Sequence, residues 1–245
     1  MILLREPGLL FLKPHKVAGT SFEIALSAFA GPDDIISPLG LRGREDEATR
    51  KALGFAGPRN YRWPFHRLPY LPQGEWRIAR RQRQWPGRFR SHLSAQLARE
   101  RLGEALWQRV TKVSIVRNPY ETAVSTYYWQ RREGESFADF WRRNAGRIGR
   151  NNHSYLIGGD DVIDLYLRYE AMGEGIAELE RRWPQLAGLG GTFASLTAKA
   201  GFRPRDRSVA SHFADAPEVA ALVERECRFE LDRFGYSLDC ATGRP

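Results

Sequence analysis

The stretch Leu9–Leu26, LLFLKPHKVAGTSFEIAL, decides the fold prediction. It begins with an apolar run, Leu9–Leu12, which has the length of a buried parallel strand. It ends with Ser21–Leu26, which has the apolar spacing of a helix start. A strand that turns sharply into a helix leaves unpaired backbone N–H groups at the turn, and these groups and the helix dipole together form an anion site.

The turn inside this stretch contains residues typical of a phosphate cradle. Gly19 lets the backbone approach a ligand closely, Lys16 adds a point charge, and Thr20 and Ser21 add hydroxyl donors. Lys16 precedes Gly19, whereas the lysine of a Walker loop follows its last glycine. The alternative is a plain strand–turn–helix connection in which Gly19 serves only as a turn residue.

A second strand–turn–helix unit begins at Lys112–Val116, a strand rich in β-branched residues. A helix is expected at Tyr120–Trp129, with Pro119 in its first turn. Two such units predict an α/β fold with a central parallel sheet, flanking helices and both turns at the carboxyl ends of the strands. There Arg117 can form two hydrogen bonds to a phosphate, and Ser125 donates from the second helical turn. Considered alone, Arg117 is explained equally well by a salt bridge, and Ser125 is explained by an ordinary position on a helix surface.

The rest of the chain is expected to form one domain, residues 1–245. Residues 58–90 are rich in proline, arginine and aromatic residues, which predicts an ordered loop or lid without long regular elements. Residues 27–90 contain no motif comparable to the two strand–turn–helix units. Further helices are expected at Ser94–Arg101, Leu102–Val110, Phe137–Arg143, Gly175–Arg182 and Pro217–Phe234, and strands at Val162–Leu167 and at Phe89–Leu93, the latter a short strand or strand end.

Composition narrows the functional classes. The 245 residues have a formal net charge of +9, which suits an anionic ligand, nucleic acid, an acidic glycan or a membrane surface. No apolar stretch approaches the ~18 residues of a membrane span, and the N-terminus has no signal-peptide pattern, so a cytoplasmic protein is expected. Cys227 and Cys240 support neither a disulfide scaffold nor a four-ligand zinc site, and free thiols are favoured over one late disulfide.

Four stretches resemble one family. Lys16–Ser21, KVAGTS, resembles the 5′-phosphosulfate loop of sulfotransferases that use 3′-phosphoadenosine 5′-phosphosulfate (PAPS), particularly the carbohydrate-type, heparan-sulfate-sulfotransferase-like branch. Val116–Ser125 resembles that family's 3′-phosphate motif, except that Thr122 stands where relatives often have a second arginine. Asp164–Glu170 resembles the family's later strand ending in Arg-Tyr-Glu, and Glu226–Tyr236 resembles its closing helix.

The resemblance implies a P-loop-like sulfotransferase fold and metal-independent, in-line transfer of a sulfuryl group from PAPS, with 3′-phosphoadenosine 5′-phosphate (PAP) as product. The implied acceptor is a hydroxyl of a carbohydrate or glycolipid, and no nucleic acid is expected as partner. Residues 27–90 match no landmark of the family, so this variable region is where acceptor specificity is expected. Lys16 is the implied catalytic residue at the leaving oxygen. The residues implied to hold the donor are Lys16, Val17, Ala18, Gly19, Thr20, Ser21, Arg117 and Ser125, with Arg205 and Arg207 in a late basic loop. For that loop and for the basic segment 150–155, the alternative is a run of solvated surface charges with no role in binding.

Two residues compete for the role of general base. Phe89–Leu93, FRSHL, resembles the Gly-His-Leu segment that precedes the second motif in carbohydrate sulfotransferases, with Ser91 in place of the glycine, and this favours His92. An imidazole with a pKa near neutrality suits the task. Glu23 is the competitor because some relatives use a glutamate near that position. A structural role is the alternative for each of them.

Two other functional classes stay open at this stage. A P-loop kinase or phosphotransferase would share the fold, but it should show the Walker order and a magnesium-binding aspartate after a strand. A non-catalytic protein that binds acidic glycans or nucleic acid would explain the charge, but it gives no reason for two paired anion motifs. The oligomeric state is not predicted.

Overall fold

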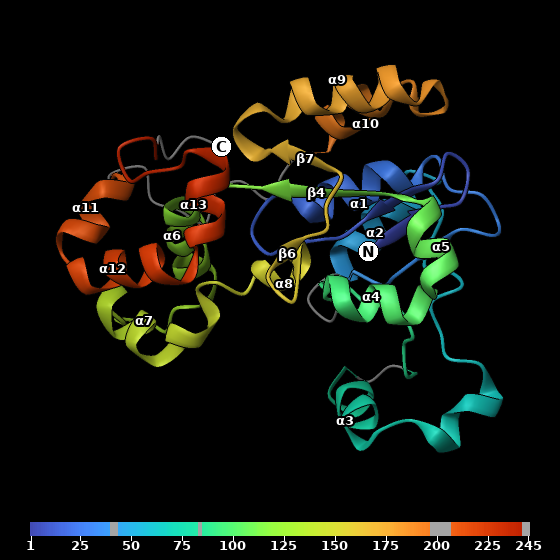
Figure 1. Cartoon of the computed structure of the whole chain (residues 1–245), viewed down its shortest axis with the longest axis horizontal. Helices are drawn as coiled ribbons and strands as arrows, with labels where there is room; N and C mark the ends of the chain where they lie inside the picture. Colours follow the sequence, from blue (N-terminus) through green and yellow to red (C-terminus); the bar gives the residue numbers. More distant parts are fainter. Residues whose placement is uncertain (40–43, 83–84, 197–206, 242–245) are drawn as a thin grey trace.

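The computed structural model describes residues 1–39, 44–82, 85–196 and 207–241. At its centre lies a five-stranded mixed sheet with the strand order β3-β1-β2-β4-β7 (Figure 1). The strands are β1 (Ile2–Leu4), β2 (Leu9–Phe11), β3 (Ile35–Ile36), β4 (Thr111–Val116) and β7 (Leu165–Arg168). β2, β4 and β7 are parallel, and β1 is antiparallel to both β2 and β3.

The parallel strands β2, β4 and β7 confirm the predicted parallel units, and the antiparallel pairing of β1 with β2 and β3 makes the sheet mixed. Ile2–Leu4 forms a strand that turns back at Gly8, whose φ of 79° needs a glycine, and Gly8 N donates to Leu4 O at 3.0 Å. Three apolar residues before a turn are by themselves only a weak indication of a strand in the sequence. They form a strand because β2 offers its edge immediately afterwards.

Helices surround the sheet. They are α1 (Gly19–Ser27), α2 (Arg44–Ala52), α3 (Gln73–Gln82), α4 (Ala95–Leu102), α5 (Glu104–Arg109), α6 (Pro119–Gln130), α7 (Phe137–Asn144), α8 (Asn152–Tyr155), α9 (Met172–Arg182), α10 (Leu189–Ser195), α11 (Val209–Ala214), α12 (Pro217–Glu226) and α13 (Arg228–Phe234). Short 3-10 turns η1 to η4 lie at Phe65–Tyr70, Ala145–Arg147, Tyr169–Ala171 and Pro184–Leu186, and a small hairpin joins β5 (Leu156–Ile157) to β6 (Asp160–Asp161).

Local sequence explains the predicted helices. Ser94 caps α4 by accepting from Leu97 N, and Asn118 caps α6 by accepting from Tyr120 N at 3.0 Å, with Pro119 in the first turn. Three expectations are wrong. Residues 58–90 contain the ten-residue helix α3, Phe89–Leu93 is not a strand, and the final helix breaks into α12 and α13.

The break at Cys227 has a packing reason. A Cβ on Gly149 would lie 2.5 Å from Glu226 O, so the loop before α8 crowds the end of α12. Cys227 has φ −112° and ψ 22°, and the chain then turns so that Phe234 packs edge-on against Tyr166 of β7. The break between α12 and α13 therefore lets these two helices pack against different surfaces of the protein.

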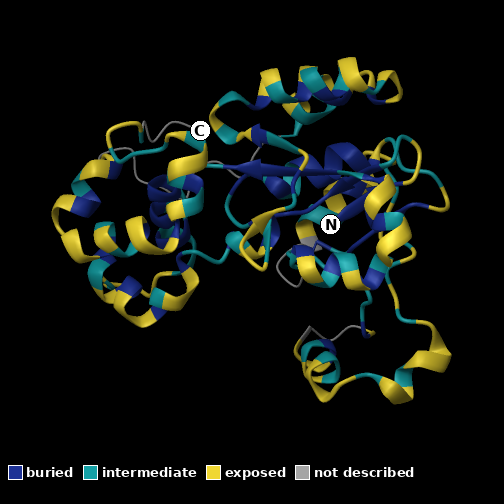
Figure 2. Ribbon diagram, viewed as in Figure 1, coloured by how far each residue is buried: buried dark blue, intermediate teal, exposed yellow. Residues whose placement is uncertain are grey.

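Strand alternation divides the core into layers. Leu9 and Phe11 face the core under α1, α9 and α10, and Leu10 and Leu12 face the core under α4 and α5. Figure 2 shows the sheet buried and much of the outer surface of the surrounding helices exposed. A third core lies between α6, α7, α11 and α12, beyond the carboxyl end of β4 (Figure 1). The connections β2–α1 and β4–α6 thus meet where the sheet borders this helical group.

Candidate functional site

The loop between β2 and α1 has an unusual backbone. Lys16 and Ala18 have φ of 62° and 59°, while Val17 and Gly19 are outside the left-handed region. In the described part of the chain only four non-glycine residues have positive φ, and His92 is another of them. Alternation of left- and right-handed residues turns successive N–H groups toward one side and forms an anion-binding concavity. Non-glycine residues with positive φ cost energy, and several of them close together are typical of a functional site.

The start of α1 adds to the same concavity. Phe22 N makes the first helical bond, to Ala18 O at 3.2 Å. By α-helix geometry the N–H groups of Gly19, Thr20 and Ser21 therefore have no partner within the helix. The hydroxyls of Thr20 and Ser21 are half-buried at this end. The predicted donor-binding loop thus has the geometry of an anion site.

Gly19 is required by a close contact. A Cβ at Gly19 would lie 2.9 Å from Cγ of Lys13, so the glycine makes room for the lysine stem. That stem places Lys13 Nζ 2.6 Å from Oε2 of the fully buried Glu23. Burial alone would raise the pKa of Glu23, but Lys13 and the α-amino group of Met1 hold it below its usual value. Glu23 is thus an ionised partner in a buried ion pair, which favours its structural role over that of a base.

Lys16 itself lies over an aromatic ring. Its Nζ is 4.5 Å from the centroid of Trp129 on α6. Burial, followed by Arg117 and Arg150, lowers the pKa of Lys16 from 10.5 to about 8. Among the described residues Lys16 forms no ion pair, so its charge is balanced by no carboxylate there.

Arg117 links the two predicted motifs. Its Nη1 donates to Lys16 O at 3.0 Å, its Nη2 lies 3.1 Å from Oε2 of Glu121, and its guanidinium stacks 4.0 Å from the ring of Tyr169. The salt-bridge alternative is therefore present, and Arg117 contacts the Lys16 loop as well. Ser125 lies on α6, the helix that also contains Glu121, and it is half-buried.

The other two resembling stretches meet beside Arg117. Glu170 accepts from Asn118 N and from the Tyr236 hydroxyl, each at 2.8 Å, and Arg168 donates to Phe234 O at 2.9 Å. These residues lie up to 118 positions apart in sequence, from Asn118 to Tyr236. The fold therefore gathers all four stretches around one end of the sheet.

His92 lies over the same loop. Its Nδ1 is 3.1 Å from Lys13 O, and its ring stacks on that of His15 at 3.7 Å and 10°. Burial, followed by His15 and Lys13, lowers the pKa of His92 well below 6.5, so the ring is neutral at neutral pH. A carbonyl oxygen only accepts, so Nδ1 bears the proton and Nε2 has the free lone pair.

A third cation comes from the loop before α8. Burial and then Arg147 lower the pKa of Arg150 to about 10, and within the described residues Arg150 forms no ion pair. Next to it, Asn151 exchanges two hydrogen bonds with the backbone of His15, at 2.8 and 3.1 Å. Burial, followed by Arg150 and Lys13, lowers the pKa of His15 to about 3. The sequence indicates only a basic segment at residues 150–155, because no local sequence pattern predicts the hydrogen bonds between Asn151 and His15.

The resemblance also implies two late arginines at the donor, Arg205 and Arg207. Arg205 lies outside the described residues. Arg207 is described, and it pairs with Asp215 at the end of α11. Within the described residues, no group of three or more His, Cys, Asp or Glu is placed to hold a metal ion.

The chain was compared with protein-family models, with curated proteins and with solved structures, and no match was found in any of the three. In the described chain no helix has both the length and the apolar character needed to cross a bilayer.

Proposed function

We propose that the chain is a PAPS-dependent sulfotransferase with a P-loop-like sulfotransferase fold, which transfers a sulfuryl group to a hydroxyl of a carbohydrate-type acceptor. One observation supports this most: the left-handed backbone of Lys16 and Ala18 lies directly before α1, and Lys16 forms no ion pair among the described residues. Such a site is matched to a multiply charged anion.

The donor brings a 5′-phosphosulfate and a 3′-phosphate. In the proposal, the N–H groups and hydroxyls of residues 19–21 hold the 5′-phosphate, and Lys16 stabilises the charge that develops on the bridging oxygen. Arg117 and Ser125 hold the 3′-phosphate. Thr122, where the resemblance departs from the family pattern, has a buried hydroxyl without a hydrogen-bond partner among the described residues, so it is available as a further donor.

His92 is the proposed general base. Its neutral ring, with the proton on Nδ1 held by Lys13 O, leaves Nε2 to take the acceptor proton. Lys16 remains mostly cationic at pH 7 because its pKa is about 8. Both charge states suit sulfuryl transfer at pH 7, but the pKa of His92 lies well below the near-neutral value expected from the sequence, so His92 is a weaker base than expected.

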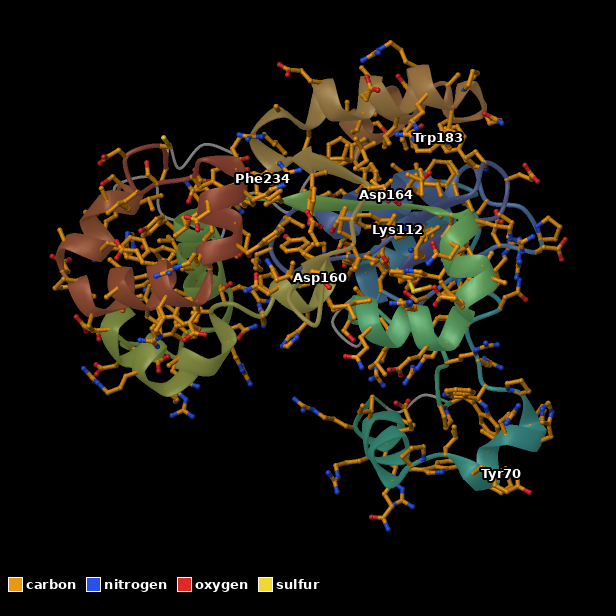
Figure 3. All side chains as sticks on the ribbon, viewed as in Figure 1. Tyr70, Lys112, Asp160, Asp164, Trp183 and Phe234 are labelled. Carbon is orange, nitrogen blue, oxygen red and sulfur yellow. The ribbon has the colours of Figure 1, made fainter. Side chains whose placement is uncertain are left out.

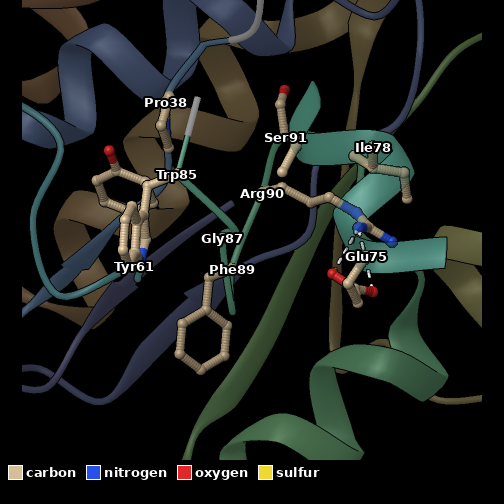
Figure 4. A pocket seen from close by; sticks show the side chains of 10 residues that line it. Pro38, Tyr61, Glu75, Ile78, Trp85, Gly87, Phe89, Arg90 and Ser91 are labelled. Carbon is tan, nitrogen blue, oxygen red and sulfur yellow. Dashed lines mark hydrogen bonds and ion pairs between the residues drawn. The ribbon is translucent and has the colours of Figure 1, made fainter. Parts of the chain in front are cut away.

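The acceptor region is proposed to extend from Ser91 to Pro38 and into residues 47–62. Ser91 Oγ, buried and without a partner among the described residues, lines a cavity of about 30 Å³ that has Tyr61 and Trp85 in its wall (Figure 4). The same two rings line a second cavity of about 620 Å³ together with Arg50 and other residues. Ring faces that stack on sugars support a carbohydrate acceptor. Neither cavity is lined by Lys16 or Arg117, so neither is the donor site.

The test is incubation with radiolabelled PAPS and separate panels of glycans, glycolipids and small alcohols. Label is expected to appear on a carbohydrate hydroxyl without added magnesium, and Lys16→Ala should abolish transfer and weaken PAP binding. Phosphoryl transfer from ATP with magnesium would establish the kinase alternative. Binding of polyanions with no thermal shift on PAP would establish the non-catalytic alternative.

The assignment of Arg117 has its own measurement. By calorimetry, Arg117→Ala should bind PAP more weakly by about 10- to 100-fold, the usual effect of losing a charge-assisted contact, and adenosine 5′-phosphate with little change. Because Arg117 also donates to Lys16 O, equal losses for both nucleotides would show that it positions the loop instead.

A further inference from the structure

The positive charge of the chain is concentrated in one segment. Residues 59–90 contain nine arginines and one acidic residue, Glu75, so this segment has a formal charge of +8 out of +9 for the whole chain. The same segment contains seven aromatic residues, from Tyr61 to Phe89. We refer to residues 59–90 as the arginine–aromatic segment. The proposed sulfuryl transfer uses almost none of this charge.

Glu75 is directed toward the body of the protein. Its carboxylate lies 3.1 Å from Arg90 Nη1 and 2.6 Å from Arg101 Nη2 of α4, as Figure 4 shows for Arg90. The single acidic residue therefore anchors α3 to the body. It leaves the outer arginines, which are Arg67, Arg77, Arg80 and Arg81, exposed and without an ion pair among the described residues.

Aromatic rings are exposed beside these arginines. Phe65 and Tyr70, at the two ends of η1, are 81% and 82% exposed, and η1 buries none of its residues. Pro64 and Pro69 restrict the backbone here. The segment stands apart from the body in Figure 1, and Figure 3 shows Tyr70 at its outer side. Large rings this exposed in a folded segment mark an interaction surface.

We propose that the arginine–aromatic segment docks on an anionic lipid bilayer. In this arrangement Phe65 and Tyr70 enter the interface between headgroups and acyl chains, and the outer arginines contact the acidic headgroups. Aromatic rings that flank cationic side chains are the combination that interfacial segments use. An acidic polymer would need the arginines, but it would give no reason for two apolar tips held outward by prolines. This inference is independent of the proposed function.

The test is co-sedimentation of the full chain with vesicles of phosphatidylcholine alone and with about one-third phosphatidylserine. Binding is expected only with phosphatidylserine and should weaken as salt increases. The double variant Arg77→Gln/Arg80→Gln should reduce the partition coefficient about 25-fold, since each basic residue contributes about fivefold. Phe65→Ser/Tyr70→Ser should reduce it at least about tenfold.

The matched control is Leu53→Ser, which removes another exposed apolar side chain, 43% exposed, outside the segment. It should bind vesicles as the wild type does. Equal binding of wild type and Phe65→Ser/Tyr70→Ser would overturn the proposal, as would absence of binding to the acidic vesicles. The proposal would also be overturned if Arg77→Gln/Arg80→Gln lost binding to a sulfated glycan or RNA but bound acidic vesicles as the wild type does. That result would show that the segment binds an acidic polymer.

Discussion

Replacing Arg150 with glutamine is expected to raise the pKa of Lys16 and to extend nucleotide binding to higher pH. Burial, Arg117 and Arg150, in that order of size, lower the pKa of Lys16 from 10.5 to about 8. Arg150 is the smallest of the three causes, so its removal should undo only a minor part of the lowering. The variant should therefore have a Lys16 pKa above about 8 and below 10.5.

The assay is calorimetric titration with PAP at pH 7, 8 and 9. Phosphate monoesters are fully ionised in this range because their second pKa is about 6, so the ligand keeps its charge. In the wild type the cationic fraction of Lys16 falls from about 0.9 at pH 7 to about 0.1 at pH 9, so affinity should fall about tenfold. Binding near pH 9 should take up a proton. Arg150→Gln should bind more weakly at pH 7 but lose less affinity toward pH 9.

Two controls isolate Lys16 in this titration. Arg142→Gln removes an arginine that is 70% exposed and pairs with Asp139, and it should leave the pH dependence unchanged. Glu230→Gln removes the other buried group with a pKa of about 8, and it should also preserve the fall in affinity. A wild-type affinity that is constant from pH 7 to pH 9 would refute the assignment of Lys16 to the donor site. An unchanged profile in Arg150→Gln would refute the electrostatic link between the two loops.

Three further predictions use other parts of the chain. His92→Asn, which tolerates the positive φ of 56°, should lower transfer by about 10²–10⁴ in single-turnover assays and leave PAP affinity within about twofold; full activity would exclude His92 as the base. Burial raises the pKa of Glu230 from 4.5 to about 8, so the folded state keeps a proton that the unfolded state loses. Wild-type stability should therefore fall relative to Glu230→Gln by about 1.4 kcal/mol per pH unit between pH 4.5 and 8, measured by urea unfolding, and parallel curves would contradict this. Gly19→Ala should cost about 1–3 kcal/mol because its Cβ meets Lys13, whereas Gly173→Ala, with open space, should cost nothing; equal unfolding midpoints for the two would show that the loop adapts.

The parallel half of the fold could be predicted because its signals are local. Leu9–Leu12 and Lys112–Val116 are apolar runs of strand length, and each is followed by turn residues and a helix start. Pro119 and Ser94 each specify a helix start within one turn of sequence. The antiparallel strand β1 was missed because its three residues form a strand only by pairing with β2 and β3.

The site was only partly predictable for the same reason. Lys16 and Arg117 lie at strand ends, where their position follows from topology. Arg150 enters the site through Asn151, whose two hydrogen bonds with His15 span 136 positions, and no local pattern encodes such a contact. The stacking of His15 on His92 is a long-range contact of this kind too.

The common environment of Lys16 and His92 explains how a cationic lysine and a neutral imidazole can lie near the same loop at neutral pH. Burial is the largest cause of the lowered pKa of each group, and neighbouring positive charge adds to it in both cases. Because the lysine starts from 10.5 it stays mostly cationic at pH 7, whereas the imidazole, which starts from 6.5, becomes fully neutral. The positive charge that favours an anionic donor therefore also keeps the proposed base unprotonated. The proposed activity should accordingly extend from well below pH 6.5 to about pH 8, which is the window in which both charges are correct.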